Sequence, residues 1–127
     1  AEIRSQAVPA SIQSIPTNAN NQDVVTMGTI AARKVANLLP DVARILAIEA
    51  LCMAQAMDLC EQQTGGASFS PVACQMRDFV REGAPFLTDD RPLSGEIEAL
   101  ASAFQQSDIT AKIFTDSPAI AGKLAQI

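Results

Sequence analysis

The chain has 127 residues, 48% of them hydrophobic, and its 9 Lys and Arg against 14 Asp and Glu give a net charge of −5. This is the composition of a folded protein, and the acidic balance disfavours binding to nucleic acid or to anionic lipid, because both need a surplus of cations. The sequence contains no His, Tyr or Trp, so this chain cannot supply a His-based triad, a His metal ligand or a Tyr general acid.

The cysteines and the first residues bear on compartment and processing. The three cysteines form no C-x-x-C pair, and no His completes a ligand set, so we expect no metal site. Free thiols are typical of a reducing compartment, which favours the cytoplasm. The first residues lack the features of a signal peptide and an initiator Met. Processing, excision from a larger protein and internal numbering each remain open.

We expect residues 1–22 to be an extended lead-in that ends in a turn. Pro9 and Pro16 push the residues before them toward extended backbone. The Asn-rich stretch 17–21 has the composition of a turn and a helix cap. Helical periodicity then covers residues 23–64, as one long helix or as a kinked pair divided near Pro40.

The second half of this predicted long helix is apolar around most of its circumference. Five of its polar residues fall on one narrow stripe at helical spacing, which Ile48 and Leu51 interrupt, and Glu49 lies roughly opposite. The residues of the stripe are Asp41, Arg44, Gln55, Asp58 and Gln62. A surface helix is apolar on one face only, so we expect this helix to be buried against other segments or other subunits. Membrane insertion is the rival interpretation, but charged residues within the span argue against it.

Short helices are expected in residues 65–127. Ser70 and Pro71 are typical of an N-cap and a first helical residue, and the helix they begin should end near Gly83. Ser94 should cap a further helix, and additional turns are expected after Ser107. No segment shows strand alternation, so the predicted fold class is all-α, a long-helix bundle.

The candidate site is the polar cluster where the long helix is expected to begin. Its members are Asn18, Asn20, Asn21, Gln22 and Asp23. Uncharged amides both donate and accept hydrogen bonds, and helix-start N–H groups favour a carboxylate or a developing anion. The alternative is a purely structural turn and cap. Glu49 is expected to be a buried carboxylate or to pair with an Arg at an interface, and the adjacent Asp89 and Asp90 are expected to be solvated rather than to bind metal.

The same cluster stands within a longer stretch that resembles the C-terminal region of the aromatic amino acid ammonia-lyases and the related aminomutases. Asn-Gln-Asp at 21–23 is followed by Met-Gly-Thr at 27–29 and Ala-Ala-Arg at 31–33. The resemblance also covers residues 9–11, 14–18, 50–52, 54–59 and 85–93.

The resemblance implies the C-terminal part of the helical fumarase/aspartase-like, histidine ammonia-lyase-like fold. It implies a homotetramer whose active sites combine residues of several subunits. It also implies the electrophilic prosthetic group 4-methylideneimidazole-5-one (MIO), which forms from an internal Ala-Ser-Gly. Enzymes of this family remove ammonia from an aromatic amino acid to give the α,β-unsaturated acid.

By position in the family pattern, Gln22 and Asn21 would lie beside the prosthetic group and the substrate, and Asn18 near the amino-acid end of the substrate. Histidine lyases usually have Glu in place of Gln22 and His in place of Val24, and plant phenylalanine lyases commonly have Glu in place of Asn18. These departures favour a tyrosine or phenylalanine substrate. No Ala-Ser-Gly and no Tyr occur in these residues, so we expect the isolated chain to be inactive and to form one wall of a composite site. An aromatic 2,3-aminomutase and a non-catalytic helical interaction domain are the alternatives.

Overall fold

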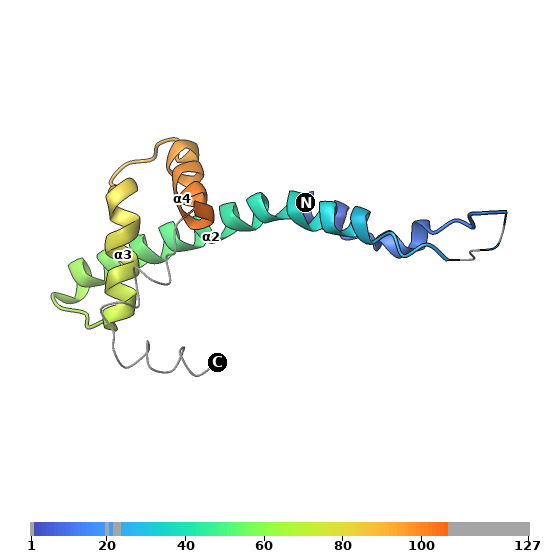
Figure 1. The fold of residues 1–127 in the computed structure, drawn as a ribbon. Coiled ribbons are helices and arrows are strands. Elements are labelled where there is room, and N and C mark those ends of the chain that lie inside the picture. Colours follow the sequence, from blue (N-terminus) through green and yellow to red (C-terminus); the bar gives the residue numbers. More distant parts are fainter. Residues whose placement is uncertain (1, 20, 22–23, 107–127) are drawn as a thin grey trace. The chain divides into compact units, whose positions relative to one another are not determined.

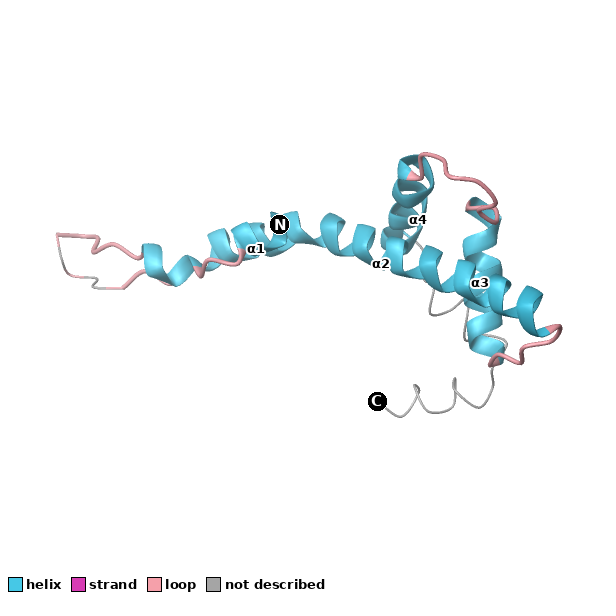
Figure 2. Cartoon of the chain, turned by 180° about the vertical axis from the view of Figure 1, so that it is seen from behind, coloured by secondary structure: helices cyan, strands magenta, loops and turns pink. Residues whose placement is uncertain are grey.

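The computed structural model of the chain describes residues 2–19, 21 and 24–106, and every regular element within them is helical. The all-α prediction is therefore confirmed. In chain order the elements are α1 (Glu2–Gln6), the short 3-10 helix η1 (Ala10–Gln13), α2 (Gly28–Thr64), α3 (Pro71–Gly83) and α4 (Ser94–Gln106) (Figures 1 and 2). The chain divides into two compact units, Ala1–Val42 and Ala43–Ile127.

In the first unit, the start of α2 differs from the sequence expectation. The described residues 24–27 are not helical, and α2 begins at Gly28 rather than at residue 23. Met27 has a left-handed backbone with a φ of 51°, and a right-handed helix cannot pass through such a residue. The lead-in also differs, because α1 and η1 interrupt the backbone that the prolines were expected to keep extended.

Pro40 does not divide the long helix, since helical geometry runs from Gly28 to Thr64 with the proline inside. A proline removes one backbone hydrogen bond and crowds the preceding turn, at a cost of about 3 kcal/mol in an isolated helix. Leu38 and Leu39 before it and Ala43 after it are strong helix formers that favour continuation.

The core of the second unit is built around a stripe of alanines. Ala43, Ala47, Ala50 and Ala54 lie at helical spacing on one face of α2 and are all buried. Against them pack Val80 and Ala84 near the end of α3, and Leu100 and Ala101 of α4. Small side chains at a contact permit neighbouring helices to approach closely.

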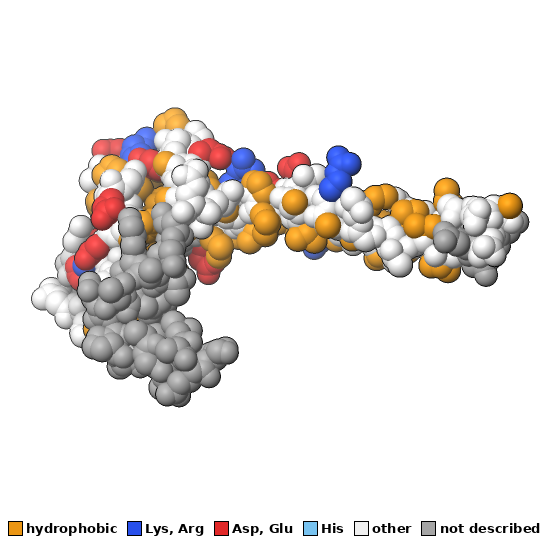
Figure 3. Space-filling model, viewed as in Figure 1, with side chains coloured by type: hydrophobic (Ala, Val, Ile, Leu, Met, Phe, Trp, Pro, Cys, Tyr) orange, Lys and Arg blue, Asp and Glu red, His pale blue; other side chains and the backbone are white. Residues whose placement is uncertain are grey.

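Large apolar side chains of α2 lie outside this core. Ile45 is 53% exposed, Ile48 46% and Met53 57%, whereas Met57 is buried and Leu51 packs against the core. Figure 3 shows hydrophobic side chains gathered on the surface along α2. The expected burial of this helix is thus not completed by the described residues. Its burial against other segments or subunits stays a prediction.

The predicted start and end of α3 are confirmed. The hydroxyl of Ser70 accepts a hydrogen bond from the N–H of Ala73 at 3.2 Å, and Pro71 is the first residue of α3. Helix α4 begins at Ser94, so this serine is the first helical residue and not the cap that the sequence predicted, and the predicted apolar face of α4 packs on the core. The rings of Phe79 and Phe104 stack with centroids 6.1 Å apart. The turns expected after Ser107 lie outside the described residues.

No helix in the described part of the chain is long and apolar enough to cross a membrane.

Candidate functional site

The structure places two of the three predicted site residues in one tight turn of the first unit. The N–H of Asn21 donates to the carbonyl oxygen of Asn18 at 3.0 Å, and both side chains are exposed. Gln22, the third predicted site residue, and Asp23 lie outside the described residues. The turn thus brings the amides of Asn18 and Asn21 to the same end of the loop.

A hydrogen bond from outside the turn closes the loop that carries these amides. The hydroxyl of Ser14 accepts from the N–H of Val25 at 2.8 Å, so the two arms of the loop meet at these residues. Farther along the same unit, the ammonium of Lys34 donates to the carbonyl oxygen of Val8 at 2.8 Å and ties the lead-in to α2. Ser14 is a supporting residue that the sequence analysis did not single out, although a Ser before an Asn-rich turn is a common partner for backbone N–H groups.

Backbone strain is concentrated in this loop and directly after it. Asn18 and Ala19 each have a φ of 54° and Met27 a φ of 51°, and they are the non-glycine residues with positive φ in the described ranges. A left-handed backbone costs an alanine or methionine about 1–2 kcal/mol, and asparagine less. Strain of this kind tends to gather at functional sites, where the surrounding structure maintains it.

The turn is not a helix cap. Six residues separate Asn21 from Gly28, where α2 begins, so the helix-start N–H groups of α2 do not act directly at the Asn18–Asn21 turn. What remains is a set of uncharged amides on a loop that is closed by Ser14. Such groups can orient a polar ligand through donated and accepted hydrogen bonds without adding a charge.

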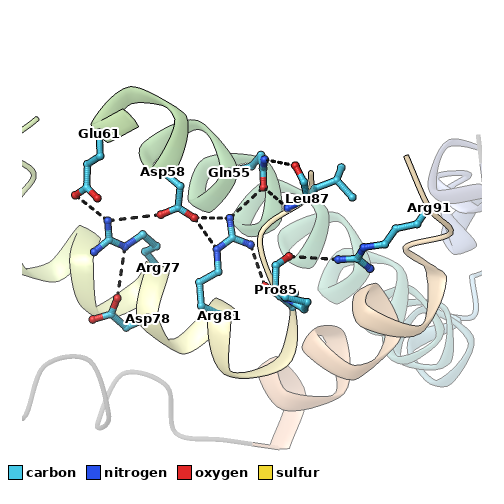
Figure 4. A network of polar contacts seen from close by, with 10 residues as sticks. Gln55, Asp58, Glu61, Arg77, Asp78, Arg81, Pro85, Leu87 and Arg91 are labelled. Carbon is cyan, nitrogen blue, oxygen red and sulfur yellow. Dashed lines mark hydrogen bonds and ion pairs between the residues drawn. The ribbon is translucent and has the colours of Figure 1, made fainter. Parts of the chain in front are cut away.

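A network of ion pairs in the second unit joins α2 to α3 (Figure 4). The guanidinium of Arg81 lies 2.7 Å from the carboxylate of Asp58, and that of Arg77 lies 2.9 Å from Glu61 and 3.6 Å from Asp58. The hydrogen bond from Arg77 to Glu61 raises the pKa of the Arg77 guanidinium, with a further contribution from Asp78. About one turn of α2 and one turn of α3 are thereby held together by paired charges.

Gln55 extends this network to the segment after α3. Its side-chain amide donates to the carbonyl oxygen of Leu87 and accepts from the N–H of Leu87, both at 3.0 Å. Arg81 donates to Gln55 at 3.2 Å and to the carbonyl oxygen of Ala84 at 2.9 Å, and its guanidinium lies 5.9 Å from the ring centre of Phe86. Gln55 and Asp58 of the polar stripe predicted for the long helix therefore have partners, which sequence spacing alone did not identify.

The remaining candidates from the sequence are the acidic residues Glu49, Asp89 and Asp90 and the three cysteines. Glu49 was expected to be a buried carboxylate or to pair with an Arg at an interface. It is exposed, so the first of these two predictions is wrong. Asp89 and Asp90 are exposed, and no group of three metal-ligating side chains occurs within the described ranges. Cys52 is exposed, whereas Cys60 and Cys74 are partly buried, and all three thiols are free.

Comparison with known proteins places these features in a family. The family model of the aromatic amino acid lyases matches residues 1–82, which include the amide turn, α2 and most of α3. The chain belongs to the aromatic amino acid lyase family. The resemblance read from the Asn-Gln-Asp block is thereby confirmed at the level of the family.

Individual relatives carry several activities in their names. The chain is 50% identical to a tyrosine ammonia-lyase of Cereibacter sphaeroides over 111 residues, which are 86% of this chain and 21% of that protein. It is 37% identical to a histidine ammonia-lyase of Natranaerobius thermophilus over 112 residues, 88% of this chain and 21% of that protein. This lyase-family chain thus spans about a fifth of the length of the curated relatives it matches.

A solved structure supports the fold assignment. The chain is similar to the crystal structure of a tyrosine aminomutase from Streptomyces globisporus, with a TM-score of 0.76 and 37% sequence identity. The similarity covers 90% of this chain and 21% of the aminomutase chain.

Proposed function

We propose that this chain is the C-terminal portion of a tyrosine or phenylalanine ammonia-lyase, in which it forms one wall of a composite active site. The observation that carries the proposal is the closed loop with the Asn18–Asn21 turn at its end, within a chain of the aromatic amino acid lyase family. The reaction is the elimination of ammonia from the amino acid to give coumarate or cinnamate.

The loop residues bind and orient in this proposal. Asn18 holds the amino-acid end of the substrate, and Asn21 and Gln22 lie beside the substrate and the prosthetic group. Neither Asn18 nor Asn21 makes a side-chain hydrogen bond within the described residues, so both amides are available to a ligand. Neutral amides suit this position because they hold a polar substrate without adding a competing charge next to an electrophile.

The prosthetic group MIO would be held by another segment and only approached by this chain. The exposed amides of Asn18 and Asn21 fit a neighbour of that kind, since its polar oxygens and nitrogens need hydrogen-bond partners. When bound, MIO supplies the electrophile that activates the amino acid for the loss of ammonia. The 127 residues contain neither Ala-Ser-Gly nor Tyr, so the remainder of the lyase must supply both, and the isolated chain is inactive.

The choice of substrate rests on two residues and on similarity. Gln22 and Val24 occupy the positions at which histidine lyases usually have Glu and His. The 50% identity to a tyrosine lyase exceeds the 37% identity to a histidine lyase and supports the same choice.

The partners in this proposal are the rest of the lyase and further subunits of a cytoplasmic homotetramer. The exposed Ile45, Ile48 and Met53 of α2 support it, because apolar surface of this size on one helix is typical of a protein interface. An aromatic 2,3-aminomutase is the second candidate, favoured by the likeness to the Streptomyces enzyme.

The test is reconstitution. The chain is combined with a polypeptide that carries Ala-Ser-Gly and the remaining lyase segments, and tyrosine or phenylalanine is added. Formation of coumarate or cinnamate is followed by ultraviolet absorbance, and β-amino acids are separated by chromatography. Product from neither amino acid in a correctly assembled complex would refute the lyase. β-Tyrosine or β-phenylalanine as the main product would establish the aminomutase instead.

A variant separates a catalytic wall from a mere scaffold. Gln22→Ala should reduce turnover by roughly 100-fold while assembly is unchanged, because an oriented donor near the reacting atoms is lost. Gln13→Ala, an exposed amide of η1, is the matched control and should retain turnover. Full turnover by the Gln22→Ala enzyme would favour the non-catalytic interaction domain.

A further inference from the structure

The lead-in to the amide loop, residues 14–25, is held against α2 with little apolar burial inside this chain. Among the described residues as far as Val42, Ala10 is the one that is buried, at 8% exposed. The larger apolar side chains of the lead-in are in solvent, with Val8 44% exposed and Ile12 68%. Because the burial of one alanine stabilises a contact only weakly, polar contacts of this chain contribute most to the position of the lead-in.

These polar contacts join the lead-in to the neighbourhood of α2 at separate points. The hydroxyl of Ser14 accepts from the N–H of Val25, before α2 begins, and the ammonium of Lys34 donates to the carbonyl oxygen of Val8, both at 2.8 Å. Lys34 follows Gly28 by six residues, so its backbone lies about 9 Å along α2 from the start of the helix. A single contact lets a segment turn about that point, whereas contacts at separate points also fix its direction.

The local sequence prepares both partners of the Lys34 contact. Val8 lies between α1 and η1 and precedes Pro9, which restricts it to extended backbone and has no N–H of its own. The carbonyl oxygen of Val8 is therefore outside both helices and needs another donor. An ammonium has three donors on a flexible stem of four carbons, and Lys34 supplies it from the second turn of α2.

The direction of the lead-in decides where the amide turn lies. Asn18 follows Ser14 by four residues, so a rotation of the lead-in about the Ser14 contact displaces Asn18 and Asn21 at the end of the loop. A displacement of about 1 Å in an orienting group can cost on the order of 100-fold in rate. We propose that Lys34 is a positioning residue of this site, which acts through the carbonyl of Val8 and touches neither substrate nor prosthetic group. This role rests on the proposed function, in which the two amides face the substrate.

The kinetic test uses the reconstituted lyase and a variant that loses only the donor. Lys34→Met keeps a side chain of similar length, and its kcat per assembled complex should fall about fivefold, with the complex quantified by size-exclusion chromatography. A merely structural role would lower the amount of complex and leave kcat per complex unchanged. Lys34→Arg keeps a donor of similar reach and should restore kcat to within about twofold of the parent.

Arg4→Met is the matched control for the loss of charge. Arg4 is an exposed cation of α1, and its side chain makes no hydrogen bond or ion pair among the described residues. The variant removes one positive charge from the same lead-in and keeps the Lys34 contact, so its kcat should equal that of the parent. An equal loss of kcat in Arg4→Met and Lys34→Met would reveal a general effect of charge and overturn the role of Lys34.

Hydrogen exchange at the Val25 amide follows the loop without any substrate. In the assembled complex, Lys34→Met should speed this exchange about threefold, because the Ser14–Val25 contact opens more often, and Lys34→Arg should return it to the parent rate. Unchanged exchange at Val25, or unchanged kcat per complex, in Lys34→Met would overturn the proposal. A parent complex that forms no product would instead refute the proposed function, and exchange at Val25 would still show whether Lys34 holds the loop.

Discussion

The side chain of Gln55 bonds to both backbone groups of Leu87. Its amide nitrogen donates to the carbonyl oxygen of Leu87, and its amide oxygen accepts from the N–H of Leu87, each at 3.0 Å. This is the hydrogen-bond pattern that a neighbouring β-strand would offer, supplied here by one side chain of a helix. The segment between α3 and α4 is thereby fixed to α2, although it has no regular structure of its own.

Replacing Gln55 with Leu should lower the free energy of unfolding by about 2 kcal/mol, because two partly buried backbone groups lose their partners. Denaturant unfolding of the full chain measures the change. Gln62→Leu, at an exposed position of the same helix, is the control and should change stability by less than about 0.5 kcal/mol. Equal stability of the Gln55→Leu and Gln62→Leu chains would contradict this role of the Gln55 hydrogen bonds.

Removing the hydroxyl that closes the amide loop should affect the proposed reaction more than the fold. Ser14→Ala frees the N–H of Val25 and lets the Asn18–Asn21 turn shift, so turnover of the reconstituted lyase should fall roughly tenfold to 100-fold. Ser11→Ala is the control, since it deletes an exposed hydroxyl of η1. Turnover that is insensitive to Ser14→Ala would show that the loop needs no closure.

Two glycines with open space around them should respond in opposite directions to alanine. Gly65, directly after α2, has a φ of 68°, so Gly65→Ala should destabilise the chain by about 1 kcal/mol through left-handed strain. Gly83, the last residue of α3, has no positive φ, and Gly83→Ala should stabilise by up to about 1 kcal/mol. Thermal unfolding of both variants is the measurement. A loss of stability for Gly83→Ala that matches the loss for Gly65→Ala would contradict the backbone argument.

The raised pKa of Arg77 fixes the sign of a pH effect. A cation whose pKa is raised on folding stabilises the protein at every pH below its unfolded-state value, and the contribution disappears only as the pH rises through the folded-state value. Between about pH 7 and about pH 10, guanidinium groups stay protonated and carboxylates stay ionised. Arg77→Met should therefore lower the free energy of unfolding by about the same amount at both ends of this range, on the order of 1 kcal/mol. A loss that shrinks toward the higher pH would refute this assignment.

Some of the fold follows from local signals. Ser70 and Pro71 predicted the start of α3, and the spacing of Leu100, Ala101 and Phe104 predicted the packed face of α4. These predictions succeed because caps and helical periodicity depend on residues within a turn or two of each other. The start of α2 was placed too early because the left-handed backbone of Met27 has no signature in the side chain.

The family signal at residues 21–33 and the fold class were thus determined by the sequence alone, since both reside in the identity and order of neighbouring residues. Tertiary structure decided which polar residues of α2 have partners. The pairing of Asp58 with Arg81 and of Gln55 with Leu87 joins positions that are 23 and 32 residues apart, and it depends on how helices pack. It also decided that four alanines of α2 form its buried contact with α3 and α4, with Leu51 packed beside them, because small side chains permit close helix contact.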